Sequence, residues 1–170
     1  MKINQSIFLL LLLFTTAIVA QEKKSLNIKR TDKAPKIDGV LDDDVWKDAE
    51  EATDFIQFRP DMGTKATEDI KTVVKMAYDD SGIYVAAYMY DDPKLIAKQF
   101  TSRDNFGQSD FFLVVLNPNN DAQNDTEFFV FSSGTQADAV ANPNNGEDFS
   151  WNAVWDSAVI LLGLEWEVWF

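Results

Sequence analysis

From residue 72 onward the side-chain pattern repeats every second residue, and this repeat constrains the fold more than any other feature of the sequence. Residues 72–78 and 83–90 predict two antiparallel strands, and the acidic, glycine-containing residues 79–82 predict the tight turn between them. Pro93 ends the second strand, because proline has no N–H to donate to a neighbouring strand. The sequence therefore predicts a β-hairpin near the middle of the chain.

Further segments extend this pattern toward the C-terminus. Residues 111–116 and 127–131 predict two strands that each end at a polar or glycine-containing turn. Residues 154–162 and 165–170 predict the last two strands, and residues 26–30 alternate like an edge strand. The sequence shows no long amphipathic helix. The predicted fold class is therefore all-β, an antiparallel β-sandwich of the jelly-roll or immunoglobulin-like type.

One short helix is expected near residues 43–49. Three aspartates at positions 42–44 precede Val45, and acidic side chains at a helix start are favoured by capping and by the helix dipole. Trp46 and Ala49 are three residues apart, so they would lie on the same side of the helix and face the core.

The start of the chain has the features of a secretory signal peptide over residues 1–20. Lys2 supplies a positive charge, residues 7–14 form an apolar run too short to span a bilayer, and Ala20 precedes a polar stretch. Cleavage after Ala20 would leave one domain over residues 21–170, and a retained N-terminal anchor is the alternative. We therefore expect an exported protein that is periplasmic, associated with the outer membrane, or extracellular.

The other end of the chain suggests an incomplete domain. Residues 160–164 carry no charge where a turn is expected, and Phe170 falls within a predicted strand. A truncated domain accounts for both observations, and a genuine C-terminal strand is the alternative.

Composition excludes several classes of function. The chain has 28 acidic and 15 basic residues, a net charge of −13, which disfavours a nucleic-acid partner because phosphates require clustered Lys and Arg. It has no Cys and no His, which excludes disulfides, thiolate nucleophiles, Ser-His-Asp triads and histidine-based zinc sites. With so many carboxylates, some pair always has suitable spacing for a glycosidase, so such a pair predicts nothing. We expect a binding protein and not an enzyme.

Residues 37–49 read IDGVLDDDVWKDA and resemble the opening signature of carbohydrate-binding module family 9, Ile-Asp-Gly-x-Leu-(Asp/Glu)-(Asp/Glu)-x-x-Trp-x-x-Ala. Residues 78–86 and 106–117 resemble the second and third elements of that family, an acidic turn before a strand and an aromatic approach to an Asp and an apolar strand. Residues 128–138 and 151–155 resemble in particular the N-terminal domains of large bacterial outer-membrane proteins, in which a C-terminal β-barrel follows.

The resemblance implies a non-catalytic module that holds an oligo- or polysaccharide between two aromatic walls, with structural calcium nearby. Trp151 or Trp155 would form one wall and Phe106 the other, although Trp155 is equally consistent with core packing. The polar rim residues that the resemblance implies are Arg103, Asp104, Asn105, Gln108 and Asn152.

Asp79, Asp80, Asp91 and Asp92 are the candidate calcium ligands, because calcium binds carboxylate oxygens. Aspartate is also common in turns, where its side chain accepts hydrogen bonds from the nearby backbone. A purely structural role in turns is therefore the alternative for all four residues.

One difference from the family keeps a second function open. Sugar-binding members commonly have a Glu two or three residues after the position of Asp110, where this chain has Phe112 and Leu113. The second hypothesis is a periplasmic structural or interaction domain of a truncated outer-membrane β-barrel protein, with no sugar ligand.

Overall fold

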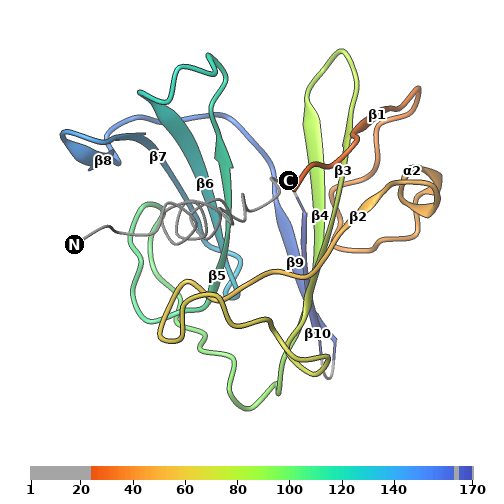
Figure 1. The fold of residues 1–170 in the computed structure, drawn as a ribbon, viewed down its shortest axis with the longest axis horizontal. Helices are drawn as coiled ribbons and strands as arrows, with labels where there is room; N and C mark the ends of the chain where they lie inside the picture. The colour runs from red at the N-terminus through yellow and green to blue at the C-terminus, as the bar shows by residue number, and fades with distance from the viewer. Residues whose placement is uncertain (1–23, 163–164, 170) are drawn as a thin grey trace, which may run out of the picture.

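The computed structural model describes residues 24–162 and 165–169, so the predicted signal peptide and Phe170 lie outside the described residues. Within these ranges the chain forms two β-sheets that face each other (Figure 1). The first sheet contains β1 (Lys29–Arg30), β2 (Glu51–Ala52), β3 (Thr72–Tyr78), β4 (Ile83–Tyr90), β9 (Ala158–Leu162) and β10 (Glu165–Trp169). The second sheet contains β5 (Phe111–Leu116), β6 (Asp125–Phe131), β7 (Gln136–Asn142) and β8 (Gly146–Asp148).

Both sheets are built mainly from antiparallel pairs. The first sheet has the strand order β1-β3-β4-β10-β9, with β2 also pairing β3, and its one parallel pair among the described residues is β1 with β3. The second sheet has the order β5-β6-β7-β8 and is antiparallel throughout. The prediction of an all-β antiparallel sandwich is confirmed.

The turn between β3 and β4 is stabilised by the side chain of Asp79. Its Oδ1 accepts hydrogen bonds from the backbone N–H groups of Ser81 (2.7 Å) and Gly82 (3.1 Å), and its Oδ2 accepts one from the Tyr84 hydroxyl (2.9 Å). These bonds lower the pKa of the Asp79 carboxyl, and the bond from the Ser81 N–H has the largest effect. The acidic turn that the sequence predicted is therefore held by its own first residue.

The main core lies between the two sheets. Three alternate residues of β4, namely Val85, Ala87 and Met89, are buried and pack with Val130 of β6. Phe112 and Val114 of β5 pack on the same cluster. This arrangement follows from the period of two, because alternate side chains of a strand point to opposite faces of a sheet.

A second cluster covers the outer face of the first sheet. The helix α2 (Asp44–Lys47) buries Trp46 against Ala77 and Ala86, and Ala49 packs on the same cluster. Lys75 reaches across β3 and donates a hydrogen bond of 2.9 Å to the carbonyl oxygen of Trp46. The predicted short helix and its core-facing residues are thus confirmed. Among the described residues, no helix has the length and apolar character needed to cross a membrane.

Several segments differ from the sequence prediction. The edge strand expected over residues 26–30 contains only Lys29 and Arg30, and the short strand β2 was not predicted. Residues 154–157 were expected to belong to the strand that ends at residue 162, but β9 begins only at Ala158. The strands β7 and β8 were not predicted, because residues 136–142 alternate alanine with Gln, Asp, Val and Asn, and residues 146–148 are Gly-Glu-Asp. The differences between residues 136 and 157 concern the region that carries the candidate site.

Replacing Trp46 by alanine tests the cluster on the outer face. The indole is 2 % exposed, so Trp46→Ala leaves a cavity and should lower the free energy of unfolding by about 3–5 kcal/mol, measured by urea denaturation. The control is Phe58→Ala, since Phe58 is 70 % exposed and its truncation should change that free energy by less than about 0.5 kcal/mol. Equal effects of the two substitutions would contradict this packing.

Candidate functional site

The centre of the candidate site is Asp138, a fully buried carboxylate on β7. Asp138 lies opposite Phe128 of β6. Its oxygens accept hydrogen bonds from the Trp155 indole Nε1–H (2.9 Å), from the Ala153 backbone N–H (2.9 Å) and from the Arg103 guanidinium. A buried charge is stable only when donors surround it, so Asp138 holds these three groups in place.

Arg103 links the loop before β5 to both β7 and the segment before β9. One guanidinium nitrogen donates to the Gln136 side-chain oxygen (2.7 Å), and the nitrogen that contacts Asp138 also donates to the Ala153 carbonyl oxygen (3.2 Å). Its guanidinium carbon lies 5.9 Å from the centroid of the Trp155 ring, within range of a cation–π contact. The Arg103 charge is therefore compensated by Asp138, and its guanidinium group lies within cation–π range of the indole.

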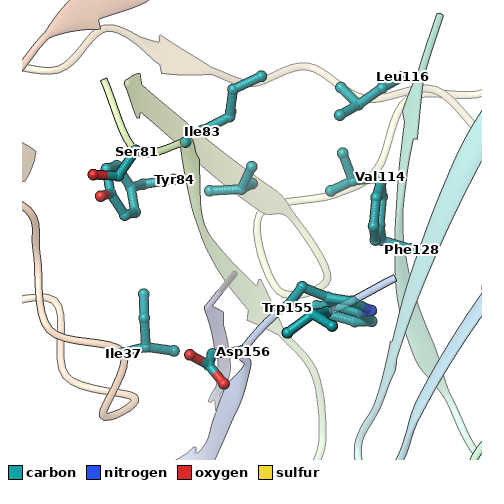
Figure 2. Close-up of a pocket in the computed structure, with 12 residues that line it drawn as sticks. Ile37, Ser81, Ile83, Tyr84, Val114, Leu116, Phe128, Trp155 and Asp156 are labelled. Atoms are coloured by element: carbon teal, nitrogen blue, oxygen red, sulfur yellow. The ribbon is translucent and has the colours of Figure 1, made fainter. Parts of the chain in front are cut away.

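Trp155 lines a cavity of about 480 Å³ between the two sheets. The centroid of its ring lies 5.4 Å from that of Phe128 in an edge-on arrangement. Figure 2 shows Trp155, Phe128 and Val114 on one side of this cavity, with Ser81 and Tyr84 on the other. The complete lining is Ile37, Ser81, Gly82, Ile83, Tyr84, Val85, Val114, Leu116, Phe128, Val154, Trp155 and Asp156. The cavity thus offers a fixed aromatic surface, apolar walls, the Ser81 hydroxyl and the Asp156 carboxylate.

Some of the predicted rim residues lie near this centre. Asp104 accepts a hydrogen bond of 3.2 Å from the Asp138 backbone N–H, so it belongs to the same network as Arg103. Asn152 is exposed and precedes Ala153, whose N–H binds Asp138. Trp151 is half-buried and contacts Phe128 edge-on, with the ring centroids 6.1 Å apart.

Other predicted residues lie elsewhere. Phe106 packs on the outer face of the second sheet, where its ring centroid is 4.9 Å from that of Phe129 and 5.1 Å from that of Phe131. Asn105 and Gln108 are exposed on the loop that carries Phe106. Trp155 packs on the inner core, so the sheet separates it from Phe106, and these two residues cannot form opposite walls of one slot.

Phe112 and Leu113 occupy the positions where a Glu was expected from the family, and both serve packing. Phe112 packs on the core between the sheets, and Leu113 packs on the outer cluster of Phe106, Phe129 and Phe131. Neither face of β5 therefore carries a carboxylate at this point.

The four aspartates considered as calcium ligands do not come together. Asp79 and Asp80 precede β4 and Asp91 and Asp92 follow it, so the eight residues of that strand separate the two pairs. Asp79 holds its turn, and Asp80 forms an ion pair with Arg30 (2.6 Å). Within the described part of the chain, no group of three or more acidic side chains has the geometry to hold a metal ion. These residues therefore fit turn and surface roles and not a shared cation site.

A separate electrostatic feature lies on the outer face of the second sheet. Burial raises the pKa of the Glu127 carboxyl above its ordinary value, and the nearby carboxylates of Glu147 and Asp125 raise it further. Glu127 Oε2 is buried and has no hydrogen-bond partner among the described residues. The charged form of Glu127 is therefore destabilised in the folded protein.

Comparison with known proteins supports the fold assignment. No protein-family model matches the sequence, and no curated protein matches it. Two solved structures of a carbohydrate-binding module family 9 domain from Caldicellulosiruptor kristjanssonii match the structure, one in complex with cellotriose and one with glucose. The TM-scores are 0.55 and 0.50, each at 22% sequence identity over 84% of this chain. The chain has a fold like that of carbohydrate-binding module family 9, here called a CBM9-like fold.

The match covers only part of the solved modules. It spans 64% of the chain in the cellotriose complex and 65% of the chain in the glucose complex, slightly less than two thirds of each. At this level of identity the likeness concerns the arrangement of the strands. The site of this CBM9-like domain must therefore be argued from its own residues.

Asp138→Asn tests the centre of the site. The asparagine side chain has one oxygen and one NH₂ group, so an N–H donor would replace an oxygen that now accepts hydrogen bonds. The loss of these bonds and of the negative charge beside Arg103 should lower the free energy of unfolding by about 2–4 kcal/mol. The emission of Trp155 should also move to longer wavelength as its indole loses a fixed partner. Asp61→Asn is the control, because Asp61 is exposed and its side chain should contribute little. An Asp138 variant as stable as this control would contradict the proposed network.

Glu127→Gln tests the electrostatic feature. The folded protein binds the Glu127 proton more tightly than the unfolded chain, so the free energy of unfolding falls as the pH rises through the raised pKa. The glutamine variant should therefore be more stable than the wild type at neutral pH. The difference should vanish in acid below the ordinary glutamate pKa, where both forms are uncharged. Urea denaturation across this pH range measures it, and a less stable variant at neutral pH would disprove the assignment.

Proposed function

We propose that this CBM9-like domain binds carbohydrate without modifying it, and that the sugar lies in the cavity beside Trp155. The observation that carries the proposal is the indole of Trp155, which lines the cavity while its Nε1–H is bound to the buried Asp138. An aromatic ring that is fixed before a ligand arrives loses little freedom on binding.

The cavity has the properties that a neutral sugar requires. Its volume of about 480 Å³ lies within the range of about 300–1,000 Å³ that is usual for small-ligand sites. The apolar C–H face of a pyranose can pack on the indole, which adds about 0.5–1.5 kcal/mol beyond the buried area. Ser81 and Asp156 supply polar groups to the sugar hydroxyls, whereas the Tyr84 hydroxyl donates to Asp79.

The solved structures support the choice of ligand class. The domain with the same fold from Caldicellulosiruptor kristjanssonii was solved in complex with cellotriose and with glucose, both of which are uncharged. A net charge of −13 on the present chain disfavours anionic polysaccharides and is compatible with uncharged ones. We therefore expect a neutral gluco-oligosaccharide or a polysaccharide built from such units.

Binding without catalysis is favoured by the carboxylates near the cavity. Glycoside hydrolysis requires two carboxylates on either side of the scissile bond, and Asp156 is the one carboxylate among the described residues that line the cavity. Glu127 has a raised pKa, but it lies on the opposite face of the second sheet from Phe128. Its carboxyl therefore has no access to a sugar that is bound beside Trp155.

The proposed place of action is outside the cytoplasm. It depends on the signal-peptide features of residues 1–20 and on the resemblance to the N-terminal domains of outer-membrane proteins. In that setting, a domain over residues 21–170 would present its sugar site in the periplasm or at the cell surface.

Tryptophan fluorescence tests the proposal with a panel of cello-oligosaccharides and other neutral sugars. A saturable change in emission is expected, and Trp155→Ala should weaken binding by about tenfold, since it removes the aromatic platform. Trp155→Phe keeps a ring without the Nε1–H and should bind with intermediate affinity, while Phe58→Ala should bind like the wild type. A folded protein that responds to no sugar, or a Trp155→Ala variant with unchanged affinity, would overturn the proposal.

A further inference from the structure

The strand β5 forms an open edge of the second sheet. Among the described residues its only strand partner is β6, and its sequence, Phe111–Leu116, has six apolar residues with neither charge nor proline. The opposite edge of this sheet, β8, has only three residues and two of them are acidic. Proteins usually protect sheet edges with charges, proline or short strands, and β5 has none of these.

The backbone of β5 directs hydrogen-bonding groups away from the sheet. The Ser132 N–H donates to the Asp110 carbonyl oxygen (2.8 Å), whereas the Phe131 N–H donates toward β7, to Thr135 (3.0 Å). In an antiparallel pair the direction alternates along the strand. The N–H and C=O groups of the odd-numbered residues, including Leu113 and Val115, therefore point toward the free edge.

The side chains beside this edge are apolar on both faces of the sheet. Phe111 and Val115 are 45 % and 49 % exposed on the outer face. On the inner face, Val114 and Leu116 line the cavity between the sheets (Figure 2). A strand added at this edge would thus bury apolar surface on both sides in addition to forming backbone hydrogen bonds.

The charges near the edge favour a cationic partner over a second copy of the chain. Val115 lies opposite Glu127, whose Oε2 has no hydrogen-bond partner among the described residues, and Asp125 and Glu147 lie close to Glu127. Two copies, each with a net charge of −13, would repel each other. A lysine or arginine side chain on the added strand would compensate this acidic group.

We propose that the free edge of β5 is a docking site for an extended segment of another protein, in which apolar side chains alternate with Lys or Arg. The segment adds to the second sheet as an antiparallel or parallel strand next to β5. This inference depends on the strand edge and its charges, and it does not require the sugar site at Trp155.

Fluorescence anisotropy with a labelled, acetylated peptide of alternating valine and lysine tests the site on the purified protein. Val115→Pro removes one outward N–H and should weaken binding by about tenfold, because proline is tolerated at a strand edge but cannot donate there. Val115→Thr keeps the N–H and strand propensity, so it should bind like the wild type. The same peptide with alternate backbone nitrogens methylated should bind at least about tenfold more weakly to the wild type.

Several results would overturn the docking site. These are failure of the peptide to bind, equal binding of the methylated peptide, and equal binding to Val115→Pro and Val115→Thr. Light scattering that showed a dimer of the protein, dissociated by Val115→Pro, would replace the peptide partner by a second copy. Trp155→Ala should bind the peptide normally, which separates a failure here from a failure of the sugar proposal.

Discussion

The buried carboxylate of Asp138 is the interaction on which the candidate site depends. It accepts hydrogen bonds from Arg103, Ala153 and Trp155, which come from two segments that flank β7 in the sequence. Burial of an ion is costly without such donors, so the loop before β5 and the segment before β9 can dock only together with this strand. The orientation of the Trp155 ring, and hence one wall of the cavity, follows from that requirement.

The strands with clear alternation could be predicted from the sequence, whereas the segment that carries the site could not. Residues 154–157 alternate like a strand, but the Ala153 N–H binds the Asp138 side chain and the Ala153 carbonyl oxygen binds Arg103. Trp155 and Arg103 could be identified as candidates, yet Asp138 is 17 residues from the first and 35 from the second. No local pattern shows that such distant residues meet, or that an aspartate between two alanines is buried.

The two faces of the second sheet carry different aromatic clusters. The inner face directs Phe128 toward Trp155 and the cavity, and the outer face packs Phe129 and Phe131 around Phe106. An aromatic-rich sequence in this region therefore does not by itself define two walls of a sugar site. All six residues of β5 are apolar, so this strand is apolar on both faces. The same apolar run therefore lines the cavity on the inner face and forms the open strand edge.

The most direct test of the central claim is nuclear magnetic resonance of the tryptophan indole N–H groups during a saccharide titration. Trp155 should show an N–H that exchanges slowly with solvent, because it is bound to a buried carboxylate, and its signal should shift in a saturable manner. Trp46 is buried between α2 and the outer face of the first sheet, so its signal should not move. A saturable shift of another indole signal, with the Trp155 signal unaffected, would contradict the account and place the ligand away from this cavity.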